Sequence, residues 1–98
     1  MNLLAKVTVK YVGPFRWATG KNEDELDVST PAEVSHLLET ILVRFETLKS
    51  AIDKGTTSCL KQSMIVLVNG IEIGLLSGLR TPLSEGDTVT LIPTAHGG

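Results

Sequence analysis

The amino-acid sequence predicts an α+β fold, in which a mixed sheet of four to five strands carries one main helix on one face. Three observations predict it. Residues 4–12 alternate between apolar and polar side chains, residues 34–48 repeat apolar side chains at helical spacing, and residues 64–68 form an apolar run. Because a lone amphipathic helix has no second helix to cover its apolar side, that side must lie on the sheet.

Alternation of apolar and polar side chains predicts the first two strands. Residues 4–12 place apolar side chains on one face of a half-buried strand. Turn formers in residues 13–20 interrupt this strand, and we expect Phe15 and Trp17 to cap the edge of the core there. Residues 25–28 alternate again and predict an antiparallel partner strand.

A strong helix start follows at residues 30–33. Thr30 is predicted as the N-cap, Pro31 as the first helical residue and Glu33 as the partner that completes a capping box. We expect the helix to run to about Ser50. Its apolar stripe comprises Val34, Leu37, Leu38, Ile41, Leu42, Phe45 and Leu48.

The second half of the chain is predicted to form mainly strands. Residues 64–68 are apolar on both faces, which predicts a strand in the middle of a covered sheet. Asn69 and Gly70 form the preferred pair for a tight hairpin turn. They lead into a short strand over residues 71–73.

The last strand is predicted over residues 88–92. A turn over residues 84–87 precedes it, and Pro93 ends it. The predicted organisation is therefore one domain over residues 1–93, followed by a flexible tail over residues 94–98.

Composition describes one ordinary soluble domain. The 98 residues are 42% hydrophobic and carry a formal net charge of −2, and the scattered charges argue against a nucleic-acid partner, whose binders show a basic face. No apolar run reaches the roughly 20 residues that cross a bilayer, and the first residues lack the apolar stretch of a signal peptide. We therefore expect a cytoplasmic protein without a membrane partner. The lone Cys59 could form neither an internal disulfide nor a thiolate metal cluster.

The end of the sequence carries the candidate chemistry. Glycine lacks a Cβ, so Gly97 and Gly98 would let the backbone enter another protein's catalytic cleft without steric hindrance. A carboxylate is a poor electrophile, and conversion with ATP into an acyl-adenylate is the usual way to activate it. We therefore expect the Gly98 carboxylate to be the reacting group and Gly97 to be an unhindered spacer. A frayed end without function or an expression scar is the alternative interpretation.

Several short motifs occur in a characteristic order along the chain: Lys6-Val7-Thr8-Val9-Lys10-Tyr11, Phe15-Arg16, Thr19-Gly20, Val68-Asn69-Gly70, Leu83-Ser84-Glu85-Gly86-Asp87 and the final Gly97-Gly98. Together they resemble the β-grasp, ubiquitin-like sulfur carriers. The most similar groups are the small subunit of molybdopterin synthase (MoaD-like) and the thiamine sulfur carrier (ThiS-like). The His-Gly-Gly ending is similar to that of the ubiquitin-related modifier family.

This resemblance implies that a ubiquitin-activating-type, MoeB-like enzyme adenylates Gly98, which is then converted to a thiocarboxylate. The sulfur would serve molybdopterin (molybdenum cofactor) biosynthesis through a molybdopterin synthase large subunit, or tRNA thiolation through a tRNA thiolase. The partner would supply the acid–base groups, so the chain would be a carrier rather than an enzyme. The chain contains no phosphate-binding glycine-rich loop, so we expect the partner to bind ATP. We expect the chain itself to need no cofactor or metal.

The resemblance also predicts a docking patch. The first and last strands of a β-grasp fold lie side by side and parallel, so Val12 and Ile92 would sit together beneath the tail, on the face away from the helix. Ile73 is a candidate third member, and His96 is a candidate contact that would steer the tail. Isolated surface hydrophobes and a solvated histidine are the alternative interpretations.

A nucleophile pair of Cys59 with His36 or His96 is a weaker hypothesis, because no third orienting group is visible. Three functions stay open at this point. The chain is a sulfur carrier, a protein modifier joined through Gly98 to lysines of target proteins, or a structural β-grasp module whose tail is incidental.

Overall fold

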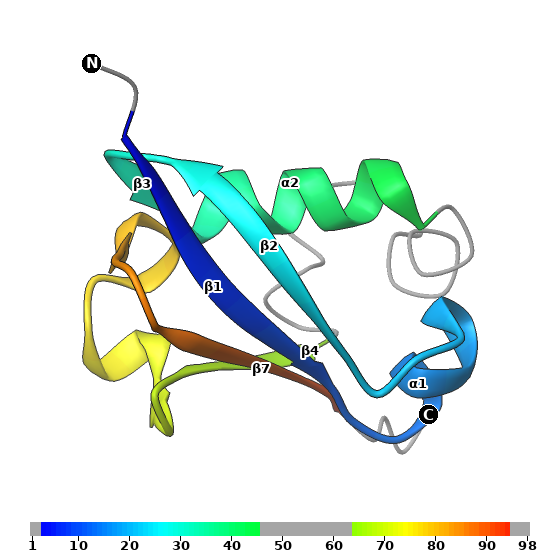
Figure 1. Ribbon diagram of the computed structural model, residues 1–98. Coiled ribbons are helices and arrows are strands. Elements are labelled where there is room, and N and C mark those ends of the chain that lie inside the picture. The colour runs from blue at the N-terminus through cyan, green and yellow to red at the C-terminus, as the bar shows by residue number, and fades with distance from the viewer. Residues whose placement is uncertain (1–2, 46–63, 95–98) are drawn as a thin grey trace.

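The computed structural model describes residues 3–45 and 64–94 (Figure 1). A five-stranded sheet with the order β2-β1-β7-β4-β5 carries α2 on one face, and β3 and β6 form a separate two-stranded ladder. This arrangement confirms the predicted α+β fold. The elements are β1 (Leu4–Tyr11), α1 (Pro14–Thr19), β2 (Glu23–Ser29), β3 (Ala32–Glu33), α2 (Val34–Arg44), β4 (Met64–Val68), β5 (Ile71–Glu72), the short 3-10 turns η1 (Ile73–Leu75) and η2 (Gly78–Arg80), β6 (Pro82–Leu83) and β7 (Thr88–Pro93).

The centre of the sheet is a parallel pair. β1 pairs parallel with β7, with Tyr11 opposite Leu91, and antiparallel with β2. On its other side, β7 pairs antiparallel with β4, which places Ile65 opposite Ile92. Because parallel strands run in the same direction, the ends of β1 and β7 meet at one edge of the sheet.

The core lies between the sheet and α2. The inward residues of β1 and β7 are buried, as their periodicity predicts, and so are Val34, Leu37, Leu38 and Ile41 of the helical stripe, whereas Leu42 and Phe45 are partly buried. Leu48 and the helix end predicted near Ser50 lie outside the described residues. The largest fully buried side chains are Leu37, Ile41, Leu91, Val7, Val9, Val34 and Val89.

The main helix begins later than predicted. Its N-cap is Glu33 rather than Thr30, and the capping-box partner is His36, whose Nδ1 accepts a hydrogen bond from the Glu33 N–H at 3.1 Å. The reason is a long-range pairing: β3 pairs antiparallel with β6, and the Val34 N–H donates to the Thr81 carbonyl at 2.9 Å. This pairing holds the chain extended just where the local sequence favours a helix.

A short helix, α1 (Pro14–Thr19), lies where the turn formers of residues 13–20 predict only an interruption of the strand. Gly13 and Gly20 bracket it with φ angles of 60° and 78°, and the Gly20 N–H donates to the Arg16 carbonyl at 2.8 Å. Phe15 is buried as predicted, whereas the prediction for Trp17 is wrong, because its side chain is 88% exposed. Two residues apart on a helix, the two side chains point in nearly opposite directions.

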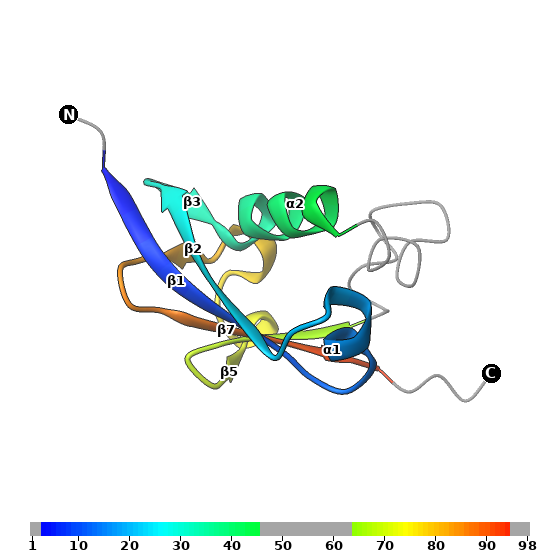
Figure 2. The same ribbon diagram turned by 45° about the vertical axis from the view of Figure 1, so that its right-hand side comes forward.

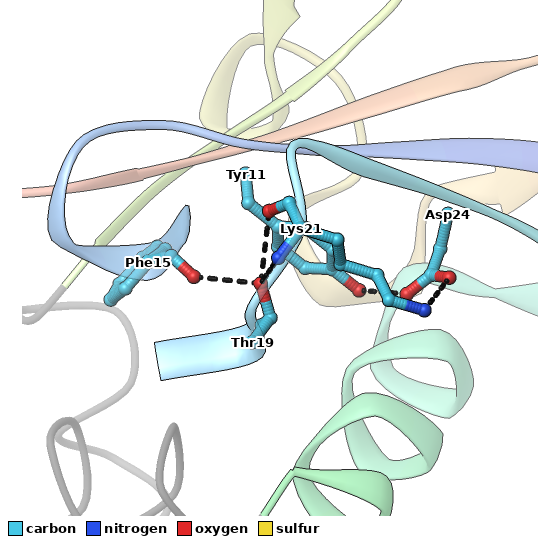
Figure 3. A network of polar contacts seen from close by, with 5 residues as sticks. All are labelled: Tyr11, Phe15, Thr19, Lys21 and Asp24. Atoms are coloured by element: carbon cyan, nitrogen blue, oxygen red, sulfur yellow. Dashed lines mark hydrogen bonds and ion pairs between the residues drawn. The ribbon is translucent and has the colours of Figure 1, made fainter. Parts of the chain in front are cut away.

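A polar network attaches α1 to the sheet (Figure 3). The Tyr11 hydroxyl donates to one oxygen of Asp24 at 3.0 Å, and the other oxygen pairs with the Lys21 ammonium at 2.9 Å. The Thr19 hydroxyl donates to a backbone carbonyl one helical turn back, at 2.9 Å. The Tyr11 ring also meets the Phe45 ring edge-on, with 6.0 Å between centroids. The network therefore joins β1, the turn after α1 and the end of α2.

The motif at residues 83–87 has a structural role at the opposite end of β7. One oxygen of Asp87 accepts from the Ser84 N–H at 2.8 Å, and the other accepts from the Asn69 amide at 3.0 Å. The Asn69 side-chain oxygen in turn accepts from the Thr88 N–H at 2.9 Å. Asn69 and Gly70 have φ angles of 52° and 85°, which confirms the predicted tight turn. The Asp87 carboxylate thus ties the start of β7 to the β4–β5 hairpin.

Replacing Asp87 by Ala removes the acceptor of two donors and should lower the free energy of unfolding by about 1 to 2 kcal/mol. Urea denaturation measures the change. Glu39→Ala on the exposed side of α2 is the control, and it should alter stability by no more than about 0.5 kcal/mol. Equal effects of the two substitutions would contradict the structural role of Asp87.

The Tyr11 hydroxyl makes stability depend on alkaline pH. Burial raises its pKa well above the ordinary value, and the hydrogen bond to Asp24 raises the pKa further. The stabilisation is complete below the ordinary tyrosine pKa of about 10 and is lost as pH rises above it, because only the unfolded chain then releases the proton. Tyr11→Phe should therefore show a shallower loss of unfolding free energy than the wild type between about pH 9 and about pH 11. Parallel pH profiles for the two proteins would contradict this assignment.

Candidate functional site

The site is the edge of the sheet at which β7 ends. β7 ends at Pro93, and Thr94 is the last described residue. The Val12 N–H donates to the Leu91 carbonyl at 3.1 Å, so the pairing of the two parallel strands continues past the end of β1. A Cβ built on Gly13 would lie 3.8 Å from the Pro93 ring. The start of α1 therefore lies beside the last residues of β7 (Figure 2).

Three aliphatic side chains form a row on the helix-free face at this edge. Val12 continues β1 next to Ile92, and Ile65 of β4 lies directly opposite Ile92. Val12 and Ile65 are each 39% exposed, and Ile92 is half-buried. Neighbouring strands are about 4.8 Å apart, so this apolar row (Val12, Ile92 and Ile65) extends over roughly 10 Å. The predicted placement of Val12 and Ile92 is confirmed, and their role in docking stays a prediction.

Ile73 does not join this surface, and its prediction as an exposed docking residue is wrong. Its side chain is only 6% exposed and packs in the core. The pleat explains the burial: Glu72 lies opposite Leu67 on the helix-free face, so the following residue turns toward the helix side. There Ile73 lines a cavity of about 130 Å³ together with Leu38, Met64, Val66 and Leu79.

Ile65 takes the place that was predicted for Ile73. The apolar run at residues 64–68 predicts a strand in a covered sheet, but α2 covers only one face, so Ile65 is exposed and Leu67 is half-buried. The sequence already indicated that Ile65 is exposed. An apolar run in a sheet with a single covering helix must expose alternate side chains.

Away from the apolar row, the helix-free face is mainly polar and charged on β1, β2 and β7, although Leu4 and the half-buried Leu67 also lie on it. Lys10 lies opposite Glu23, and Lys6 lies opposite Asp27, so positive side chains on β1 face negative side chains on β2. An apolar patch framed by polar groups is typical of a surface that docks a partner. The polar frame consists of Thr8, Lys10, Thr88 and Thr90 on the two central strands, with Glu23, Glu25 and Asp27 on β2.

The other predicted site residues divide between two groups. His96, Gly97 and Gly98 lie outside the described residues, as does Cys59, so their predicted roles are not tested. His36 is an exposed residue of the capping box of α2. Within residues 3–45 and 64–94, no cluster of three His, Cys, Asp or Glu side chains could hold a metal ion. In the same part of the chain, no helix has the length and hydropathy to span a membrane.

Comparison with solved structures gives close likenesses over nearly the whole chain. The small archaeal modifier protein 1 (SAMP1) from Methanosarcina acetivorans is 32% identical, with a TM-score of 0.78 over 98% of this chain and 99% of that one. A putative molybdopterin converting factor, subunit 1, from Pyrococcus furiosus is 29% identical, with a TM-score of 0.75 over 93% and 99%. A chain of the Amycolatopsis orientalis BexX/CysO complex is 26% identical, with a TM-score of 0.70 over 94% and 99%.

Sequence comparison agrees with these likenesses. No curated protein gives a significant match, but the model of the ThiS family matches residues 9–98. The structural neighbours are β-grasp, ubiquitin-like proteins, which confirms the fold expected from the motifs. The chain therefore belongs to the ThiS family, within the ubiquitin-like sulfur carriers and modifiers.

Proposed function

We propose that this protein is a ubiquitin-like sulfur carrier whose Gly98 carboxylate is adenylated by a ubiquitin-activating-type, MoeB-like enzyme and then converted to a thiocarboxylate. The observation that carries the proposal is the family match, which extends to Gly98. β7 ends at the edge of the sheet where the apolar row lies. Residues 94–98 would be the tail that the partner engages.

The chemistry needs two substitutions, the first at the α-phosphorus of ATP and the second at the Gly98 carbonyl carbon. A carboxylate oxygen of Gly98 attacks the α-phosphorus of ATP, and pyrophosphate leaves, so the product is an acyl-adenylate. A sulfide nucleophile then attacks the carbonyl and displaces AMP, which leaves the thiocarboxylate. Neither Gly97 nor Gly98 has a side chain beside the reacting carbon, so attack is unhindered. The enzyme partners bind ATP and deliver sulfur.

The apolar row supports docking of such a partner. It lies at the edge of the sheet from which the chain continues toward Gly98, and charged residues surround it. A partner that covers Val12, Ile92 and Ile65 would be fixed close to the tail, and fixing the reacting groups in place supplies much of the rate of such a reaction. The relative from Amycolatopsis orientalis was itself solved in a complex, BexX/CysO.

For the sulfur acceptor, the relative from Pyrococcus furiosus favours molybdopterin biosynthesis. Its name describes it as a putative subunit of a molybdopterin converting factor. The corresponding partner of this chain would be a molybdopterin synthase large subunit, with the chain as the small subunit of that complex. Transfer of sulfur to tRNA through a thiolase is the alternative route for the same thiocarboxylate.

A second candidate function is supported by the relative with 32% identity, which is named a modifier protein. In that function, the amine of a target lysine attacks the Gly98 acyl-adenylate, or a thioester derived from it, and the product is an isopeptide bond. Both candidates share the adenylation step and differ in the nucleophile.

Intact-mass measurement separates the two functions. The protein is incubated with its cognate activating enzyme, ATP and a sulfide donor. A carrier should gain the mass difference between sulfur and oxygen on its last residue, whereas a modifier should appear as lysine-linked adducts in cell extract. Deletion of Gly98 should abolish both products, while Leu4→Ala at the far end of β1 should preserve them. A mature protein that naturally continues past residue 98 without trimming would contradict the proposal.

A charge placed in the apolar row should weaken docking. Val12→Asp should raise the dissociation constant for the activating enzyme about tenfold or more, because a carboxylate would be buried without a partner at the contact. Leu4→Asp is the matched control, because Leu4 is a 53% exposed aliphatic residue at the opposite end of β1. Calorimetry measures binding, and thermal unfolding confirms that both variants fold. Equal affinities for the two variants would contradict a docking role for the row.

A further inference from the structure

Trp17 is an exposed aromatic side chain that neither the core nor the proposed chemistry uses. At 88% exposed, it is the most exposed of the large hydrophobic residues in residues 3–45 and 64–94. Its neighbour Arg16 is also exposed and forms no ion pair within the described part of the chain, whereas Lys21 is engaged by Asp24. Tryptophan and arginine are the residues most enriched among those that dominate binding energy at protein interfaces.

The helix that carries Trp17 is fixed to the domain. Phe15 anchors α1 in the core, and the left-handed Gly20 ends it. Lys21, in the following turn, pairs with Asp24 of β2, which accepts a hydrogen bond from Tyr11 of β1. The network in Figure 3 thus holds the backbone on both sides of Trp17. A side chain on a fixed backbone loses less conformational entropy on binding than one on a mobile loop.

The position of α1 connects Trp17 to the proposed site. α1 lies against the end of β7, and Gly13, just before it, is next to Pro93 (Figure 2). The helix also follows directly from Val12, the first member of the apolar row. The helix that carries Trp17 and the apolar row therefore lie at the same end of β7.

We propose that Trp17 is a second docking point for the adenylating enzyme, which receives the indole in an apolar recess with an acidic rim facing Arg16. This inference rests on the proposed function. An enzyme that acts on Gly98 must hold the last residues of the chain in its cleft. The surface that lies close to Pro93 in space, which includes α1, would therefore face the enzyme. Contacts at both the apolar row and Trp17 would fix the orientation of the domain, and hence the direction in which the tail enters the cleft.

Steady-state kinetics of ATP–pyrophosphate exchange tests this role. Trp17→Ala should raise the KM for the carrier about tenfold or more with kcat unchanged, because it removes binding without touching the reacting carboxylate. Trp17→Phe should restore part of the loss. Arg16→Ala should raise the KM less and weaken its dependence on salt concentration. Leu75→Ala is the matched control, because Leu75 is 81% exposed on η1, and it should leave the KM unchanged.

A spectroscopic measurement reports on the contact directly. Trp17 is the only tryptophan of the chain, so a protein labelled with 5-fluorotryptophan gives one fluorine signal. That signal should shift or broaden when the activating enzyme and ATP are added, and removal of residues 95–98 should not shift it in the free protein.

The outcomes separate this inference from the function on which it rests. If the wild type is adenylated and Trp17→Ala has the same KM, the docking role of Trp17 is overturned and the carrier function stands. If Trp17→Ala is adenylated normally but transfers sulfur slowly, the indole binds the acceptor enzyme, and the proposal is equally overturned. A fluorine signal that responds to loss of residues 95–98 but not to the enzyme would overturn it too, because the tail itself would then cover Trp17. If the wild type is not adenylated, the proposed function is the part that fails.

Discussion

Parallel pairing of β1 with β7 brings two distant parts of the chain to the same edge of the sheet, and the features of the candidate site follow from it. It places Val12 beside Ile92, sets the start of α1 against Pro93 and makes that edge the point from which the chain continues toward Gly98. A parallel pair needs a long crossover, which α2 supplies while burying its apolar stripe. At the other end of the pair, the Thr8 N–H donates to the Asp87 carbonyl at 2.9 Å, and the Asp87 carboxylate ties the start of β7 to the β4–β5 turn. A slip of one residue would move Ile92 to the opposite face of the sheet.

Most of the fold could be predicted because the strongest signals are local. Periodicity within one element predicts the strand that ends at Tyr11 and the helix that includes Leu37 and Ile41. The positive φ angles that a tight turn requires predict the turn at Asn69-Gly70. The neighbouring positions of Val12 and Ile92 were also predictable once the parallel pairing was expected from the resemblance. These predictions need only the sequence within one element and the order of the elements.

The three wrong predictions have one long-range cause and two local ones. The helix start moved from Thr30 to Glu33 because β3 pairs with β6, a segment some fifty residues away, and tertiary pairing overrides a local capping signal of about 1 kcal/mol. Ile73 was misplaced because a one-residue shift after the hairpin reverses the face to which a side chain points. Trp17 was misplaced because a short helix replaced a turn, and hydrophobicity alone does not say which of two nearby aromatic residues turns inward.

The acidic character of β2 has a consequence for how the protein behaves at high concentration. Among the strands of residues 3–45 and 64–94, β2 is the outermost on its side of the sheet and pairs only with β1, so one row of its backbone groups has none of these strands beside it. An open strand of this kind can template the addition of another molecule, and growth by repetition of that step leads to aggregates. Glu23, Glu25 and Asp27 would face the same three carboxylates on a second β2, and this electrostatic repulsion disfavours addition. The sheet can therefore expose hydrophobic side chains at one end while its border resists self-assembly.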